Sequence, residues 1–216
     1  MSIREDERRG ESGDAPRRGR PRDQAVDERI LDVARAVYAE RGWAGFNFDV
    51  VAARARVSKD AMYRRYTSKM DLLMATMTNS GGGHDAIPYD GDIRAYLMAL
   101  AREYLKRYSA EHGLGSLRIF IEGIENAELL DAYHREQSAP AVLRARATVR
   151  RAMEAGQLPL ETSPTAILDA ILGGVIMHVL ATPPGLREKM IAGSELYLNQ
   201  LVDLVLRGCG YDFGTG

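Results

Sequence analysis

The chain has 216 residues, of which 45% are hydrophobic and 27% charged, a length and composition that suit one or two globular domains and exclude a fibrous protein. Its 29 Lys and Arg residues against 30 Asp and Glu give a net charge of -1, which by itself indicates no class of partner. A single Cys excludes a disulfide framework, and the charged N-terminus lacks the apolar segment of a signal peptide, so we expect a cytoplasmic protein.

Residues 1–26 are rich in Gly, Arg, Asp and Pro and show no apolar periodicity, so we expect a disordered basic arm. Within it, the string RRGRPR at 17–22 resembles an AT-hook core, in which Arg18 and Arg20 would enter a narrow minor groove of DNA. A merely solubilising tail is the other interpretation. The position of the arm, directly before a predicted helix-turn-helix, favours the groove.

Four helices are predicted between residues 27 and 78. The first begins at Asp27, buries an apolar stripe and ends at Gly42. Asn47 is a suitable N-cap for a helix over 48–55, and Ser58 for one over 59–66. These two short helices are separated by two residues only, which predicts a helix-turn-helix.

A capping box, Ser68-Lys69-Met70-Asp71, opens the fourth helix, which continues through Met77. The charge of this region differs from that of the rest of the chain. Residues 15–69 carry 13 Lys and Arg against 7 Asp and Glu, whereas residues 70–216 carry 13 against 18. A basic segment joined to an acidic body is typical of a nucleic-acid reader with a regulatory domain, although a solvated charged surface would give the same count.

Residues 79–88 (NSGGGHDAIP) predict a flexible break, and residues 89–208 a larger helical domain for regulation and dimerisation. A continuous apolar stripe runs from Ile93 to Tyr108. Further helices are expected around 115–123, 126–136, 139–155, 163–181 and 186–207. No segment alternates with period two, so the predicted fold class is all-α: an N-terminal helix-turn-helix domain followed by a larger helical domain.

The last two predicted helices are apolar on more than one side, which requires burial on two sides. Packing against a second copy of the chain is the favoured interpretation, with a central helix inside one protomer as the alternative. The predicted dimer contacts are Ile171, Gly174, Val175, Tyr197, Leu201 and Leu204. The longest nearly apolar run, 170–181, contains His178 and is too short to span a bilayer, so we expect no membrane partner.

The segment 17–77 resembles the DNA-binding domain of the TetR family of transcriptional regulators. The features that carry the resemblance are Arg41-Gly42, Val51-Ala52-Ala53, the turn Val57-Ser58-Lys59, and Met62-Tyr63-Arg64-Arg65-Tyr66 followed by Lys69 and Leu72-Leu73. The segment 159–208 resembles the last two helices of that family, which form a dimeric four-helix bundle. In three places this chain departs from the family pattern: Arg56 stands where Gly is usual, Asn47 where Thr or Ser is common, and Tyr66 where Phe or Trp is usual.

The first turn of the predicted recognition helix supplies the candidate base contacts Ser58, Lys59, Asp60 and Ala61. Lys59 can donate hydrogen bonds to guanine O6 and N7. Asp60 either accepts a hydrogen bond from cytosine N4 or only stabilises the positive N-terminal end of the helix. The candidate phosphate contacts are Tyr63 and Arg64 on the same helix, with Asn47 and Lys69 at helix starts. Arg56 either sits in a turn that avoids the left-handed conformation or is retained to contact phosphate.

Helical bundles bind small molecules in mostly apolar cavities with a few polar anchors. The candidate ligand contacts are Tyr104, Tyr108, Phe120, Met177 and His178, with Arg118 and Glu122 as charged anchors. Each of these could equally be an ordinary core residue. The family resemblance implies that a bound ligand shifts the helix beginning near Lys69 and so changes the separation of two recognition helices.

These features predict a ligand-responsive repressor that binds double-stranded DNA at a near-palindromic operator as a homodimer and is released by an unidentified small-molecule effector. A non-switching dimeric DNA-binding protein and, less well supported, an all-helical enzyme are the alternatives. The four His residues and Cys209 are scattered without zinc-ligand spacing, so we expect no catalytic residues, metal or cofactor.

Overall fold

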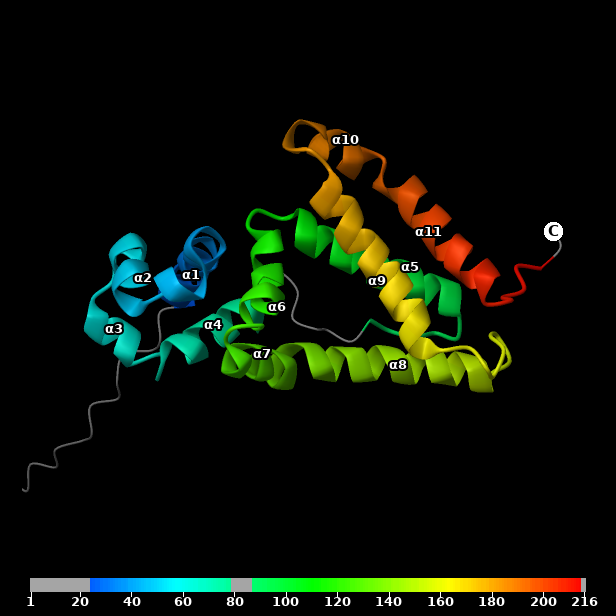
Figure 1. Cartoon of the computed structure of the whole chain (residues 1–216), viewed down its shortest axis with the longest axis horizontal. Helices are drawn as coiled ribbons and strands as arrows, with labels where there is room; N and C mark the ends of the chain where they lie inside the picture. Colours follow the sequence, from blue (N-terminus) through cyan, green and yellow to red (C-terminus); the bar gives the residue numbers. More distant parts are fainter. Residues whose placement is uncertain (1–23, 79–86, 215–216) are drawn as a thin grey trace, which may run out of the picture.

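The computed structural model describes residues 24–78 and 87–214, and every regular element within those ranges is a helix. An N-terminal unit, residues 24–78, contains α1 (Gln24–Gly45), α2 (Phe48–Ala55), α3 (Lys59–Tyr63) and α4 (Lys69–Thr78). A C-terminal unit, residues 87–214, contains α5 (Ile93–Ser109), α6 (Arg118–Glu122), α7 (Ala127–Tyr133), α8 (Ala139–Glu154), α9 (Pro164–Ala181), α10 (Arg187–Ala192) and α11 (Ser194–Gly208). The predicted all-α fold with two units is confirmed, and α2 and α3 lie at the end of the molecule opposite α11 (Figure 1).

Side-chain caps set the helix starts in the N-terminal unit. The backbone N–H of Val50 donates to Asn47 Oδ1 at 3.0 Å, that of Ala61 to Ser58 Oγ at 3.2 Å, and that of Asp71 to Ser68 Oγ at 3.0 Å. Each bond satisfies a donor that the first helical turn leaves without an intrahelical partner. The three predicted starts are therefore confirmed.

Three predicted boundaries in this unit are wrong. The first helix does not end at Gly42 but kinks there and continues to Gly45. Helix α1 begins at Gln24, so residues 24–26 of the expected arm are helical, and α3 ends at Tyr63 instead of residue 66. The remainder of the predicted arm, including Arg18 and Arg20, lies outside the described residues, as do residues 79–86 of the predicted break.

The N-terminal unit has its own core, built around α1. Ile30, Ala34 and Tyr38 are fully buried where α1 packs against α2 and α4, and Met62 of α3 belongs to the same buried cluster. The same cluster includes Ile119, Leu129 and Ala132 from α6 and α7. The two units therefore share apolar contacts, and α6 and α7 join them.

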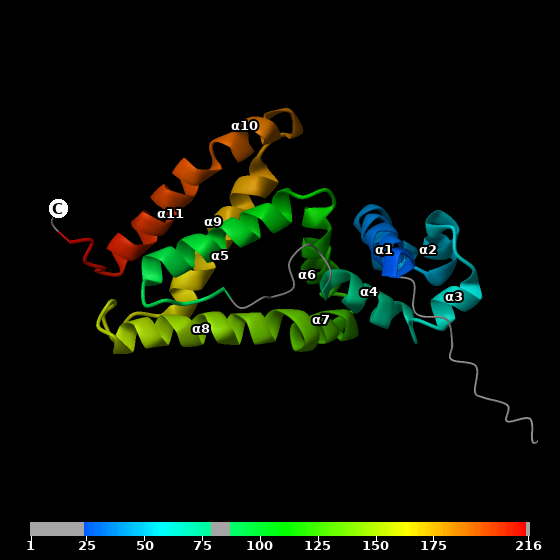
Figure 2. The same ribbon diagram turned by 180° about the vertical axis from the view of Figure 1, so that it is seen from behind.

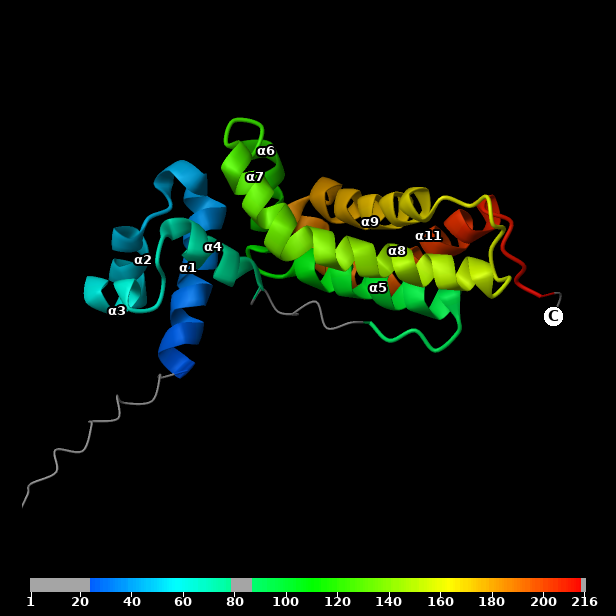
Figure 3. The ribbon, with the colours of Figure 1, turned by 90° about the horizontal axis from the view of Figure 1, so that it is seen from below.

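A second core fills the C-terminal unit between α5, α8, α9 and α11. Helix α5 packs against both α9 and α11, and α8 against α9 (Figures 1 and 2). Viewed from below, α5 and α8 run alongside each other (Figure 3). The helix predicted over 186–207 is interrupted: a 3₁₀ turn, Pro184–Leu186, precedes α10, and Gly193 separates α10 from α11. Other short turns are Gly113–Leu117 (3₁₀) and His134–Ser138 (π).

Arg56 adopts the left-handed conformation, with φ 54° and ψ 47°, at the C-terminus of α2. Its backbone N–H donates toward the carbonyls of Ala52 and Ala53, which closes the helix. Of the two sequence interpretations, the one in which the turn avoids this conformation is wrong. A residue with a Cβ costs about 1–2 kcal/mol there, so Gly would be the less strained residue at this position.

This strain predicts a stability gain for Arg56→Gly. Relief of the left-handed strain contributes about 1–2 kcal/mol, whereas the backbone entropy that Gly loses on folding costs about 0.5–1 kcal/mol. The net gain in the free energy of unfolding is therefore about 0.5–1 kcal/mol. The melting temperature should rise by about 2 °C in a thermal unfolding measurement. Arg56→Ala is the matched control: it removes the same charge but keeps the Cβ, so it should give no gain. Equal melting temperatures for the two variants would contradict the strain argument.

Candidate nucleic-acid interface and ligand cavity

Helix α3 is buried on one side and open to solvent on the other. Met62 is fully buried, whereas Tyr63 is 64% exposed and Arg64 is exposed as well. In the first turn, Ser58, Lys59 and Asp60 are exposed and Ala61 is half-buried. The predicted contacts Ser58, Lys59, Asp60, Tyr63 and Arg64 are therefore all exposed on α3 and its caps, and α3 lies at one end of the molecule (Figure 1).

Helix α2 positions the first turn of α3. Lys59 Nζ lies 2.8 Å from Asp49 Oδ1, and the ring of Tyr63 meets that of Phe48 edge-on with 5.0 Å between centroids. Asp49 raises the pKa of Lys59 through the hydrogen bond, so the ammonium group stays charged. Because this pair is well exposed, its value lies in orienting Lys59, and it adds little to folding stability.

Lys69 has a position that its sequence pattern did not reveal. Its Nζ donates to the carbonyl of Trp43 at 3.3 Å and lies 3.8 Å above the Trp43 ring. The start of α4 is thus fixed to the end of α1. A phosphate contact by Lys69 stays a prediction, and would have to be made by an ammonium group that already has these partners.

The end of α1 is also bound by α6, through a charged pair that we call the clamp, Arg118 and Glu122. Glu122 accepts hydrogen bonds from Tyr38 Oη at 2.8 Å and from the Trp43 backbone N–H at 3.1 Å. Arg118 donates to the carbonyl of Ala39 at 2.9 Å and pairs with Glu122 at 3.2 Å. The prediction that Arg118 and Glu122 anchor a ligand is not supported. Both side chains face α1, and neither lines the cavity that lies between α5, α8 and α9.

Two further features fit the clamp. Gly42 has φ 64°, and a Cβ at this position would lie 2.0 Å from Glu122 Oε1, so the close approach requires Gly. Burial raises the pKa of Tyr38, and the hydrogen bond to Glu122 raises it further, so the phenol remains a neutral donor.

A cavity of about 590 Å³ lies between α5, α8 and α9. Tyr104 lines it as predicted, together with Tyr96, Leu100, Ala145, Leu168 and Leu172. The other predicted ligand contacts lie elsewhere. Tyr108 is buried in the core, the ring of Phe120 packs edge-on against Tyr133 at 5.5 Å, Met177 is 57% exposed on the outside of α9, and His178 stacks on Tyr197 at 3.7 Å.

The charged residues of this cavity were not among the predicted ligand contacts; they are Glu103, Lys106, Arg107, Arg144, Arg146, Arg151 and Asp169. The dense Arg residues between 144 and 151 were a visible signal. Which of them face the cavity depends on how three helices pack, and this is not encoded in the local pattern.

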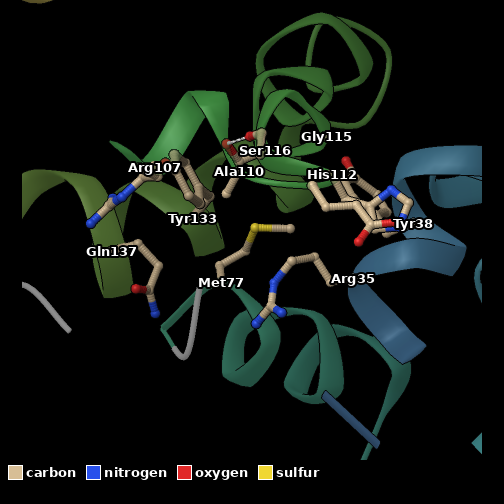
Figure 4. A pocket seen from close by; sticks show the side chains of 12 residues that line it. Arg35, Tyr38, Met77, Arg107, Ala110, His112, Gly115, Ser116, Tyr133 and Gln137 are labelled. Atoms are coloured by element: carbon tan, nitrogen blue, oxygen red, sulfur yellow. Dashed lines mark hydrogen bonds and ion pairs between the residues drawn. The ribbon is translucent and has the colours of Figure 1, made fainter. Parts of the chain in front are cut away.

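A smaller crevice of about 140 Å³ separates the two units (Figure 4). Arg35 and Met77 border it from the N-terminal unit, and Arg107 and His112 from the C-terminal unit. Beside it, Gln137 Nε2 donates to Thr78 Oγ1 at 2.6 Å, which ties the end of α4 to the turn after α7. A change in this region would reach α4 directly.

The predicted dimer contacts divide into three groups. Ile171 and Val175 are fully buried in the core of their own protomer, so their assignment to a dimer interface is wrong. Gly174, Tyr197 and Leu201 join α9 to α11: Tyr197 Oη donates to the Gly174 carbonyl at 2.9 Å, and a Cβ on Gly174 would lie 2.9 Å from Leu201 Cδ2. Leu204, by contrast, is 70% exposed.

An apolar outer surface, which we call the α9/α11 face, consists of Met177, Leu180, Leu196 and Leu204, all more than half exposed. Helix α9 is long and apolar enough to cross a membrane, so the expectation that this segment is too short is wrong on length, but core helices of a bundle meet the same criterion. The buried side of α9 packs against α5.

Within residues 24–78 and 87–214, no group of three or more His, Cys, Asp or Glu side chains could hold a metal ion.

Comparisons with known proteins match both units. The family model "Bacterial regulatory proteins, tetR family" matches residues 30–76, and "Tetracyclin repressor-like, C-terminal domain" matches residues 87–194. The DNA-binding transcriptional repressor TetR of Mycobacteroides abscessus is 27% identical over 82% of this chain and 90% of its own. The uncharacterized HTH-type transcriptional regulator YdeS of Bacillus subtilis is 23% identical over 77% of this chain and 84% of its own. The solved structure of Salmonella enterica GusR has a similar fold, with TM-score 0.66, 17% identity and coverage of 86% of this chain and 96% of its own.

The clamp predicts a specific stability loss for Glu122→Gln. The substitution keeps the shape of the side chain but removes the negative charge of the group that accepts hydrogen bonds from Tyr38 Oη and the Trp43 N–H. Hydrogen bonds to charged groups contribute about 1.5–3 kcal/mol, so the free energy of unfolding should fall by that amount in urea titrations.

The matched control is Glu125→Gln, which alters an exposed carboxylate in the turn after α6. It should change stability by less than about 0.5 kcal/mol. If both variants unfold at the wild-type urea concentration, the clamp does not contribute to stability as described.

Proposed function

Since the chain belongs to the TetR family and is a DNA-binding transcriptional regulator, we propose that it is a repressor that binds a near-palindromic operator as a homodimer and leaves it when a small molecule occupies the C-terminal unit. The observation that carries the proposal is the accessible surface of α3 and its caps, on which Ser58, Lys59, Asp60, Tyr63 and Arg64 are exposed together. Members of this family are generally not enzymes, and the cytoplasm is the compartment we propose, because the DNA target is there.

Readout of bases is assigned to Ser58, Lys59, Asp60 and Ala61, whose turn enters the major groove. Tyr63 and Arg64 on the next turn, Asn47 at the start of α2, Arg56 in the turn and Lys69 at the start of α4 contact phosphates. Arg18 and Arg20 of the arm add minor-groove contacts. Each phosphate contact releases counterions, so affinity falls steeply with salt.

A homodimer follows from the limited information that one short helix can read. Two half-sites, one helical turn of DNA apart, give useful specificity only when two recognition helices are held together. The α9/α11 face supports this, since its exposed side chains are apolar and lie on helices whose other sides are buried. Leu204 remains among the proposed dimer contacts. Met177, Leu180 and Leu196 replace Ile171 and Val175, which are buried in the protomer's own core.

Repression is favoured over activation because a bound dimer blocks polymerase without further apparatus. The relative named a repressor matches 82% of this chain, whereas the transcriptional activator FasR of Mycolicibacterium smegmatis matches 33% at 39% identity. A DNA-binding protein that does not switch is the remaining alternative. The cavity between α5, α8 and α9 supports switching, because it gives a ligand a place to bind.

Release requires that the ligand stabilise a conformation with altered α4. To lower the fraction of protein in the DNA-binding conformation from 99% to 1%, the ligand must bind the other conformation more tightly by about 5.5 kcal/mol. The contacts of α4 with Trp43 and Gln137 offer a mechanical route from the C-terminal unit to the recognition helices.

The DNA interface predicts a reduced salt dependence for Arg64→Ala. Removal of one phosphate contact per protomer should lower the slope of log affinity against log salt by about 0.9 per subunit, for all DNA sequences tested. Fluorescence anisotropy with the DNA upstream of the gene, at several salt concentrations, measures this slope. Arg150→Ala, at an exposed position on α8, is the control and should leave the slope unchanged. An unchanged slope for Arg64→Ala would mean that the register of α3 is wrong.

The α9/α11 face predicts that Leu204→Asp gives a monomer. A carboxylate introduced in each subunit would be desolvated in the interface without a partner, a cost of several kcal/mol. Sedimentation velocity should show the wild type as a dimer and Leu204→Asp as a folded monomer with greatly weakened operator binding. Leu143→Asp, at an exposed Leu on α8, should remain dimeric. A dimeric Leu204→Asp protein would place the interface elsewhere.

A further inference from the structure

The large cavity has a charge opposite to that of the domain around it. Five cationic residues line it against two acidic ones, namely Lys106, Arg107, Arg144, Arg146 and Arg151 against Glu103 and Asp169. Residues 70–216 as a whole carry 13 Lys and Arg against 18 Asp and Glu. Positive groups are therefore concentrated at the cavity of an acidic domain, and a concave site lined by one sign of charge attracts ligands of the other sign.

Arg146 on α8 is the clearest member of this group. Its Nε is buried without a hydrogen-bond acceptor, and its guanidinium pairs with no carboxylate in the described part of the chain. A buried guanidinium N–H that makes no hydrogen bond costs free energy, and an anionic ligand would accept a hydrogen bond from it. Arg151, one helical turn further on, donates to Thr148 Oγ1 at 3.1 Å and lies 5.1 Å from the Tyr89 ring, again with no carboxylate among the described residues.

The remaining wall is apolar. Tyr96, Leu100, Leu168 and Leu172 line the cavity from α5 and α9, and Ala145 from α8. Burial raises the pKa of Tyr96 and Tyr104, so both phenols stay neutral and add no negative charge. A volume of about 590 Å³ suits an organic molecule and is far larger than a hydrated inorganic anion needs.

From the charge, the unsatisfied Arg146 donor and the apolar wall, we propose that the cavity binds an amphipathic organic anion, with its carboxylate or equivalent group at Arg146 and its apolar body against Leu100, Leu168 and Leu172. This inference deepens the proposed function, since it names the class of effector for the cavity assigned there. It excludes amines and other organic cations as effectors.

Arg107 connects this ligand to the DNA-binding unit. It lines the cavity and also the crevice that Arg35 and Met77 border from the N-terminal unit (Figure 4). An anion that draws the Arg107 guanidinium toward the cavity changes the crevice wall next to α1 and α4. The anionic group thereby acts on the contact between the units as well as providing affinity.

The test uses two matched pairs of probes that differ in the sign of the head group: decanoate with decylammonium, and 2-naphthoate with 2-naphthylmethylammonium. Isothermal titration calorimetry with the full-length protein measures binding, and thermal unfolding provides a second readout. We expect the anion of at least one pair to bind at least tenfold more tightly than its cation. Equal or tighter binding of both cations, or no binding by any probe at 1 mM, would overturn the proposal.

Substitutions in α8 locate the head group. Arg146→Gln should weaken anion binding about tenfold or more, because it removes a charge-assisted hydrogen bond. Arg150→Gln, on the exposed side of the same helix and outside the cavity, is the matched control and should bind like the wild type. Far-ultraviolet circular dichroism and the melting temperature show that both variants are folded. Equal effects of the two substitutions would overturn the assignment of Arg146.

Operator binding by the ligand-free protein is measured in the same preparations. If the protein binds the anion but not DNA, the ligand class stands and the proposed regulatory function fails. If it binds DNA and discriminates against the anions, the ligand class fails and the DNA-binding function stands. Release of DNA by the bound anion supports both, and Arg107→Gln should then release less DNA than the wild type when the two are compared at equal occupancy of the cavity.

Discussion

The arrangement of this molecule depends on how the C-terminal end of α1 is satisfied. Gly42 turns the chain with φ 64°, which leaves the Trp43 N–H and the Ala39 carbonyl directed away from the helix. Glu122 and Arg118 of α6 supply the acceptor and the donor that these groups need, and Tyr38 Oη completes the set. Since backbone polar groups must find partners when water is excluded, the orientation of α1 relative to α6 is fixed at this point.

The same segment of α1 also fixes the position of α4. Lys69 binds the Trp43 carbonyl and lies over its ring, while Gln137 holds the other end of α4 through Thr78. Helix α4 is therefore attached to both units, and α2 and α3 follow α1 as one packed body. A rearrangement of α6 or α7 would reach α1 and α4 through these hydrogen bonds and through the apolar contacts that the two units share.

The sequence predicts the local features well and the long-range ones poorly. The caps Asn47, Ser58 and Ser68 involve residues three positions apart, so the pattern alone locates the helix starts. The roles of Arg118 and Glu122 depend on groups 79 and 84 positions away in the chain, and no periodicity reveals them. Ile171 and Val175 show the same limit: an apolar helix indicates burial on two sides, but the side that faces the protomer's own core is decided by α5 and α8.

Two arginines occupy positions that oppose folding stability. Arg56 adopts a left-handed conformation that Gly would adopt without strain, and Arg146 buries an Nε without an acceptor. Local rules of this kind are usually broken at functional sites, where a group serves binding at some cost in stability. Both positions carry the side chain with the strongest preference for phosphates and carboxylates, one at the turn before α3 and the other in the cavity. The anion recognition proposed for both positions gives them a single physical reason.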